Sequence, residues 1–169
     1  MDNIKRKNKW LILIPILLAI WFIWSNSLDP PSASYEKSDV FMKKVSEILS
    51  GILSPDNNFL IFFKVHVRKI AHFLEYALLG NVISISMFAL DIKKIRHFYY
   101  AFSFCVIAAV IDEYIQIYTK RGSSVRDIVI DFLGFTFGFI IVSLIYLICV
   151  SVKRIMKKRK KISLYFTVL

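Results

Sequence analysis

Four apolar segments, each long enough to cross a membrane as a helix, constrain the fold of this chain more than any other feature. They run from Trp10 to about Ser27, from Asn58 to Leu90, from Phe98 to Tyr118 and from Asp127 to Val152. A transmembrane helix needs about 20 predominantly apolar residues. We therefore predict an all-α, polytopic integral membrane protein with four transmembrane helices plus a short interfacial amphipathic helix.

The positive charge of the chain is confined to alternate connections between these segments. Of the 23 basic residues, 14 lie before the first segment, in the link around residue 94 and after residue 152. Loops rich in Lys and Arg stay in the cytoplasm, so both termini are predicted to be cytoplasmic in a multi-pass protein of the cell membrane. This pattern accounts for the net charge of +11 without a nucleic-acid partner. We predict a transmembrane domain over 10–152 and a basic cytoplasmic tail over 153–169, which anionic membrane lipids would attract.

The connection over residues 29–57 is expected on the outer side of the membrane. Pro30 and Pro31 are expected to end the first helix. Apolar residues at helical spacing from Asp39 to Leu53 predict a short amphipathic helix on the outer leaflet, followed by a turn over 54–57. The second segment is longer than a membrane core requires, so its first third is expected in the interface and the true span from about Lys69 to Leu90.

Two other features of the apolar segments have more than one interpretation. The first segment resembles a signal peptide, with small residues at 32–34 before Tyr35, but that site lies well past the apolar run and an uncleaved helix is favoured. Cys105 and Cys149 lie within apolar runs and are predicted to be small buried hydrophobes. Their placement suggests neither a disulfide framework nor a thiolate metal site.

Ionisable residues in three of the four segments fall toward one membrane face, the outer one in this topology. A charged residue in hydrocarbon costs at least ~2.5 kcal/mol, which makes such a concentration a candidate functional site. Arg68, His72 and Glu75 share one helical face, and Asp112 and Gln116 share another. A third helical face carries two aspartates followed by a GxxxG pattern: Asp127, Asp131, Gly134 and Gly138. The GxxxG pattern favours close packing of helices.

These residue types suggest both proton chemistry and anion binding. The candidate catalytic residues, as acids and bases, are His72, Glu75, Asp112 and Glu113. The candidate binding residues are Arg68, Lys69, Tyr76, Gln116, Arg121, Ser124, Arg126, Asp127 and Asp131. Their spacing matches no established metal-ligand motif, so no cofactor or metal residue is assigned, and a divalent cation is the less favoured alternative. Charged residues near span ends can also reach water or pair to stabilise the bundle.

At these residues the chain resembles the VanZ-like family. The matching stretches are Lys69-x-x-His72-Phe73-x-Glu75-Tyr76-x-x-Leu79-Gly80 and Asp112-Glu113-x-x-Gln116-x-x-x-x-Arg121-x-x-Ser124-x-x-Asp127-x-x-x-Asp131-x-x-Gly134-x-x-x-Gly138, together with the polar residues 24–30. The resemblance covers about residues 10 to 150 and implies a four-helix integral membrane protein. The family's founding member is associated with low-level resistance to teicoplanin, a lipid-bearing glycopeptide. This sequence departs from the family at Asp131, where many members have Asn.

The leading hypothesis is a cell-envelope membrane protein whose polar site in the extracytoplasmic leaflet binds an amphiphile. The partners it implies are membrane lipids and a lipid-linked cell-wall precursor or lipoglycopeptide antibiotic. The alternatives are a transferase or hydrolase acting on a lipid-linked phosphate, and a non-catalytic membrane scaffold. A small transporter is disfavoured, because the cytoplasmic halves of the segments carry no polar path. Whether the site is enzymatic, and the oligomeric state, stay open at this point.

Overall fold

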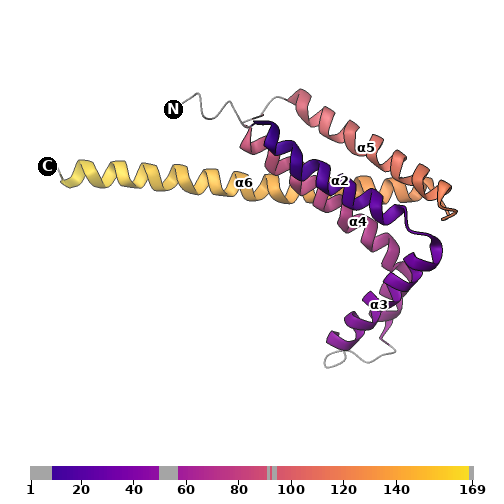
Figure 1. Ribbon diagram of the computed structural model, residues 1–169. Helices are drawn as coiled ribbons and strands as arrows, with labels where there is room; N and C mark the ends of the chain where they lie inside the picture. Colours follow the sequence, from indigo (N-terminus) through magenta and orange to yellow (C-terminus); the bar gives the residue numbers. More distant parts are fainter. Residues whose placement is uncertain (1–8, 50–56, 91, 93–94, 168–169) are drawn as a thin grey trace.

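The computed structural model describes residues 9–49, 57–90, 92 and 95–167, and they form helices joined by short connections (Figure 1). The elements are the short 3-10 helix η1 (Lys9–Ile12) and the α-helices α2 (Leu13–Ser27), α3 (Pro31–Leu49), α4 (Asn58–Ala89), α5 (Ile95–Tyr118) and α6 (Val125–Thr167). Four stretches are long and apolar enough to cross a membrane: Trp10–Ser27, Asn58–Ala89, Ile95–Tyr118 and Val125–Arg159. The all-α, polytopic prediction is confirmed.

The bundle is organised so that α2 and α6 each pack against both α4 and α5. This arrangement places α4 and α5 at opposite corners, and their side chains meet in the interior. The apolar core between them is built from fully buried residues of four helices, including Ile23, Leu79, Ala109 and Phe135. Aromatic rings of α5 and α6 extend this core, since the centroid of Phe102 lies 5.4 Å from that of Phe135.

The interface between α4 and α6 is the most extensive in the bundle and depends on three glycines. A Cβ atom built on Gly134 would lie 2.2 Å from the carbonyl oxygen of Phe73, and one on Gly138 would lie 2.0 Å from that of Ala77. On the opposite helix, a Cβ on Gly80 would lie 2.1 Å from the carbonyl oxygen of Phe135. The two backbones are therefore in contact, as the GxxxG pattern predicts.

The helix between the first two spans begins earlier than the sequence pattern indicated. We expected it at Asp39, but α3 begins at Pro31. Proline suits the first position of a helix, where its missing N–H would have no partner, so Pro31 starts a helix here as well as ending the preceding one. Figure 1 shows α3 turned away from the bundle, beside the first part of α4, where the ring centroids of Phe41 and Phe63 are 6.3 Å apart. Residues 50–53 of the expected helix, and most of the expected turn, lie outside the described residues.

Two spans are continuous over lengths that the sequence pattern had divided. Helix α4 runs unbroken through its expected interfacial third, from an N-terminal cap in which Asn57 Oδ1 accepts a hydrogen bond of 2.8 Å from the amide of Phe59. Helix α6 continues past Val152 into the basic segment as far as Thr167. Neither Gly nor Pro follows Gly138, and Lys and Arg are good helix formers, so nothing ends the helix where the apolar residues end.

The two cysteines differ in environment, which corrects one expectation. Cys105 is fully buried in the core, as predicted, whereas Cys149 is exposed on the outside of α6. Helix α6 is much longer than the helices it packs against, so residues in its second half have fewer neighbours. Cys149 is thus positioned to face the membrane rather than the protein interior.

The connection between α5 and α6 is a tight turn that directs Arg121 back toward the bundle. Lys120 adopts a left-handed conformation with φ of 58°, and the amide of Arg121 donates a hydrogen bond of 2.8 Å to the carbonyl of Gln116. This is the Schellman arrangement that commonly ends helices. We call this part of the molecule the α5–α6 end; the α2–α3 connection lies at the same end of the bundle (Figure 1).

Candidate functional site

Polar side chains from four helices and one loop gather inside the α5–α6 end of the bundle. Helix α2 provides Asn26, and α4 provides His72 and Glu75. The remaining members come from α5, the α5–α6 turn and α6; they are Asp112, Glu113, Gln116, Arg121 and Asp131. Most of these side chains are buried, although burying charge without a partner is costly. The contacts among them therefore determine what the site can do.

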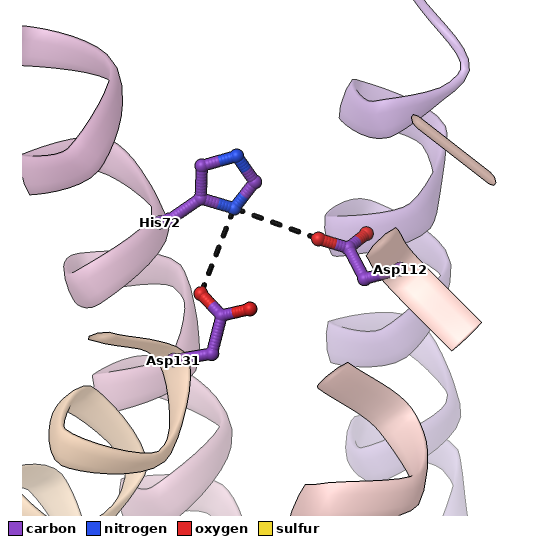
Figure 2. A group of neighbouring side chains, drawn as sticks. All are labelled: His72, Asp112 and Asp131. Carbon is purple, nitrogen blue, oxygen red and sulfur yellow. Dashed lines mark ion pairs between the residues drawn. The ribbon is translucent and has the colours of Figure 1, made fainter. Parts of the chain in front are cut away.

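At the centre, one imidazole lies between two carboxylates from different helices (Figure 2). The Nδ1 atom of His72 is 3.5 Å from Asp112 Oδ2 and 3.7 Å from Asp131 Oδ1. Asp112 and Asp131 are both 0% exposed, and His72 is 9% exposed. This group, which we call the central triad, joins α4, α5 and α6. It forms because α4 and α5, at opposite corners of the bundle, both present polar residues to the interior.

A second layer of hydrogen bonds holds Glu113 between α5 and the start of α6. Gln116 Nε2 lies 3.2 Å from Glu113 Oε1 and 3.4 Å from Asp112 Oδ2. The backbone amide of Ser124 donates to Glu113 Oε2 at 2.8 Å. The Ser124 hydroxyl in turn accepts from the amide of Arg126 at 3.1 Å and so caps α6. Glu113 is thereby satisfied through both of its oxygens.

A third set of contacts joins α2 to α4 and to the α5–α6 turn. Asn26 Nδ2 donates to Glu75 Oε1 at 2.8 Å, and Arg121 Nη1 donates to the carbonyl oxygen of Asn26 at 2.8 Å. Arg121 is only 8% exposed. Burial first, and then the charge of Arg68, lowers the pKa of Arg121 from its ordinary value. Because that ordinary value is far above neutrality, the guanidinium keeps its charge at pH 7.

A cavity of about 380 Å³ lies beside these contacts, between α2, α3, α4 and the α5–α6 turn. Three basic side chains line it: Lys37, Arg68 and Arg121. Its apolar lining includes Phe22, Phe41, Leu74 and Leu78, which are also exposed on the outside of the bundle. His72 and Glu75 line its inner wall. The cavity therefore connects the outer surface of the helices with the edge of the central triad.

The structure gathers most, but not all, of the residues that the sequence pattern selected. Lys69 and Arg126 are exposed on the outside of the bundle and do not line the cavity, and Asp127 is half-buried in the first turn of α6. Tyr76 is fully buried in the apolar core, where its hydroxyl has no hydrogen-bond partner. Lys69 is one residue beyond Arg68, a rotation of about 100° around the helix, so the two cannot share a face.

Sequence reasoning did not select several polar residues of the cavity. Asn26 binds Glu75, and Asp29 pairs with Lys37 at the mouth, where their N–O distance is 2.5 Å. Asn26 belongs to the polar stretch 24–30, which is part of the family resemblance. A polar residue near the end of an otherwise apolar span was a usable signal. Lys37 carried no such signal, because its helix was expected to begin at Asp39.

The arrangement offers proton donors, proton acceptors and cation ligands in one place. His72 and the two carboxylates of the central triad could exchange protons with a group entering from the cavity. One ligand atom from each of these three residues lies within 4.8 Å of the others, so the triad could also hold a metal ion. Arg68 and Arg121 could bind a phosphate or carboxylate in the cavity.

Comparison with known proteins assigns the chain to a family but to no characterised relative. The family model described as VanZ/LLP1 matches residues 12–147, which reach into all four spans and include every residue of the central triad. No curated protein and no solved structure matches the chain. The match agrees with the resemblance drawn from the motifs of α4, α5 and α6.

Proposed function

This chain belongs to the VanZ/LLP1 family, and we propose that its cavity binds the anionic head group of an amphiphilic component of the cell envelope. The observation that carries the proposal is the composition of the cavity lining. Lys37, Arg68 and Arg121 line the same space as the apolar side chains of α2 and α4. The two acids of the lining already have partners, since Asp29 pairs with Lys37 and Glu75 accepts from Asn26. A ligand with a negative head and an apolar chain matches that combination.

The head group would bind to the two arginines. Arg68 is partly buried, its Nε has no hydrogen-bond partner, and its guanidinium carbon lies 5.5 Å from the ring centroid of Tyr35. Arg121 uses Nη1 to bind the Asn26 carbonyl and also has an unpartnered Nε. Guanidinium groups bind phosphates and carboxylates through paired hydrogen bonds, which suits these free donors.

The apolar chain would leave the cavity sideways into the lipid. Phe22, Leu74 and Leu78 line the cavity and are exposed on the outside of α2 and α4, where the membrane would surround them. An amphiphile could therefore enter from the bilayer without leaving it. The basic segments at the other end of the bundle favour a cytoplasmic position for that end, which would open the cavity to the extracytoplasmic leaflet.

Binding can be tested with the full-length protein in nanodiscs. We expect a polyprenyl phosphate to bind and the uncharged polyprenol to bind at least about tenfold more weakly, since a charged hydrogen bond contributes roughly 1.5–3 kcal/mol. Arg68→Gln and Arg121→Gln should reduce phosphate binding. Lys69→Gln and Arg126→Gln remove the same charge from exposed positions and should not. Equal loss in all four variants would refute the proposed cavity and indicate a surface charge effect.

Two sources of such a ligand are distinguished by the same assay. A lipid-linked cell-wall precursor and a lipoglycopeptide antibiotic such as teicoplanin both join an anionic or polar head to an apolar chain. We propose the lipid-linked phosphate as the resident ligand, because both arginines favour phosphate. Competition by teicoplanin, but not by a glycopeptide without an acyl chain, would make the antibiotic the ligand. The resistance phenotype would then be tested by growth on teicoplanin with and without Arg68→Gln.

Catalysis is the second candidate, because His72 lines the cavity and also belongs to the central triad. In a transferase or hydrolase, His72 or Glu75 would act as the general base. It would accept a proton from the group that attacks the bound phosphate. Incubation with lipid-linked precursors should then yield a new product, which His72→Gln would abolish while leaving binding intact. If His72→Gln and Asp112→Asn lose melting temperature and function in equal proportion, the cluster is a non-catalytic scaffold instead.

A further inference from the structure

We propose that the central triad of His72, Asp112 and Asp131 is a binding site for a divalent transition-metal cation such as Zn²⁺. The inference goes beyond the proposed amphiphile binding and does not depend on it. It rests on the number of unpaired buried groups, on the distances between them and on the residue types. Figure 2 shows the imidazole Nδ1 and both carboxylates directed toward one another from three helices.

The first argument is a count of charges and partners. Glu75 accepts from Asn26, and Glu113 accepts from Gln116 and Ser124. The triad is less well satisfied: Asp112 Oδ2 accepts from Gln116, but both carboxylate oxygens of Asp131 and Nδ1 of His72 are buried with no hydrogen-bond partner. A single imidazole N–H can donate to one carboxylate only. A divalent cation would neutralise both carboxylates at once.

The second argument is distance. Hydrogen bonds between a charged N–H and a carboxylate are usually about 2.7–2.9 Å long, and the separations from His72 Nδ1 are 3.5 Å to Asp112 and 3.7 Å to Asp131. Two ligands bound about 2.1 Å from one ion lie roughly 3.0–3.4 Å apart. The observed separations are closer to this spacing than to that of a hydrogen bond. The three ligand atoms lie within 4.8 Å of one another, so side-chain rotations that draw them closer would bring all three onto a common ion.

The third argument concerns the kind of ion. One imidazole and two carboxylates suit Zn²⁺, Mn²⁺ and similar ions, whereas Ca²⁺ and Mg²⁺ favour oxygen ligands alone. Three protein ligands leave at least one coordination position, as catalytic rather than structural sites do. His72 also lines the cavity, so that position could be reached from there. Gln116, within 3.4 Å of Asp112 Oδ2, is placed to orient that ligand.

Asp131 supplies the second carboxylate of the triad, 3.7 Å from His72 Nδ1 and fully buried. An amide oxygen binds transition metals more weakly than a carboxylate and carries no charge to offset that of the ion. Asp131→Asn is therefore both the sharpest test and a replacement of nearly the same size and shape.

The test uses full-length protein in nanodiscs, stripped with a chelator and titrated with Zn²⁺ and, as a visible-absorption probe, Co²⁺. We expect one ion per chain, no competition from Mg²⁺ or Ca²⁺ and a higher melting temperature when the ion is bound. Asp131→Asn and His72→Gln should weaken binding by at least about 100-fold, since even residues that only orient a ligand contribute 10- to 100-fold. Asp127→Asn is the matched control, because Asp127 lies one turn closer to the N-terminus of α6. This variant should bind the ion normally.

Two results would overturn the proposal. Equal binding by the wild type and Asp131→Asn would place the ion at an adventitious surface site. No binding by the wild type, with Asp131→Asn melting at a higher temperature, would show that the triad shares a proton instead. If His72→Gln fails to fold, the nearly isosteric Asp131→Asn still decides between these results. The assay contains no amphiphile, so failure of lipid binding and failure of metal binding are separate outcomes.

Discussion

Asn26 and Glu75 join α2 to α4 through one hydrogen bond of 2.8 Å, from Asn26 Nδ2 to Glu75 Oε1. The same Asn26 accepts from Arg121 through its backbone carbonyl. A residue of the first span thus positions both the carboxyl group of Glu75 and the guanidinium group of Arg121. The cavity wall at this point depends on α2 as much as on the helices that carry the family motifs.

Asn26→Ala is expected to destabilise the protein by about 1–3 kcal/mol, because it leaves the partly buried Glu75 without its donor. Thermal unfolding in detergent measures the change. Ser25→Ala is the matched control, since Ser25 donates only to the carbonyl of Phe22 in its own helix. In a double-mutant cycle, Glu75→Gln should reduce the effect of Asn26→Ala. Strictly additive effects would show that the hydrogen bond contributes no coupling.

Gly138→Ala is expected to destabilise the bundle by roughly 1–3 kcal/mol or more, as overpacking does elsewhere. The new methyl group would meet the backbone carbonyl of Ala77, which cannot rotate away as a side chain could. Gly122→Ala offers the control, because a Cβ there has nothing within 4 Å. Both variants are compared by melting temperature and by size-exclusion profile. A normal melting temperature for Gly138→Ala would contradict the backbone contact between α4 and α6.

Much of the fold could be predicted because it depends on local patterns. Apolar length alone identified four spans, and the spacing of Arg68, His72 and Glu75 placed them on one face, which the structure turns toward the cavity. The GxxxG pattern similarly identified the surface of α6 that contacts α4. Periodicity within a helix is sufficient for such inferences.

Other parts of the site required the three-dimensional arrangement. No periodicity within one helix indicates that α4 and α5 occupy opposite corners, which is why His72 meets Asp112 in the interior. The positive charges of Lys69 and Arg126 suggest anion binding, but helix rotation directs both side chains outward. Pro31 predicts the end of a helix, but proline at a first helical position also permits a start, and α3 begins there.

Ser124→Ala is expected to cost about 0.5–2 kcal/mol, the usual range for the loss of an N-terminal cap. Its hydroxyl accepts from the amide of Arg126, and its own amide holds Glu113, so fraying of the first turn of α6 would also loosen Glu113. Ser123→Ala, at the exposed neighbouring position, should be neutral. Unfolding measurements on both variants test this. Equal stability of the two would mean that the cap contributes nothing to the folded state.

The orientation of the bundle can be tested by labelling intact cells, since the distribution of basic residues predicts that the α5–α6 end faces outward. In a background with Cys105→Ala and Cys149→Ala, a membrane-impermeant maleimide should label Ser123→Cys, which lies in the exposed turn. Lys158→Cys is the control, because it lies in the exposed basic segment after Val152, about 50 Å along α6 and beyond a ~30 Å hydrocarbon core. It should react only after permeabilisation. The reverse pattern would place the cavity in the cytoplasmic leaflet and remove external amphiphiles from its ligands.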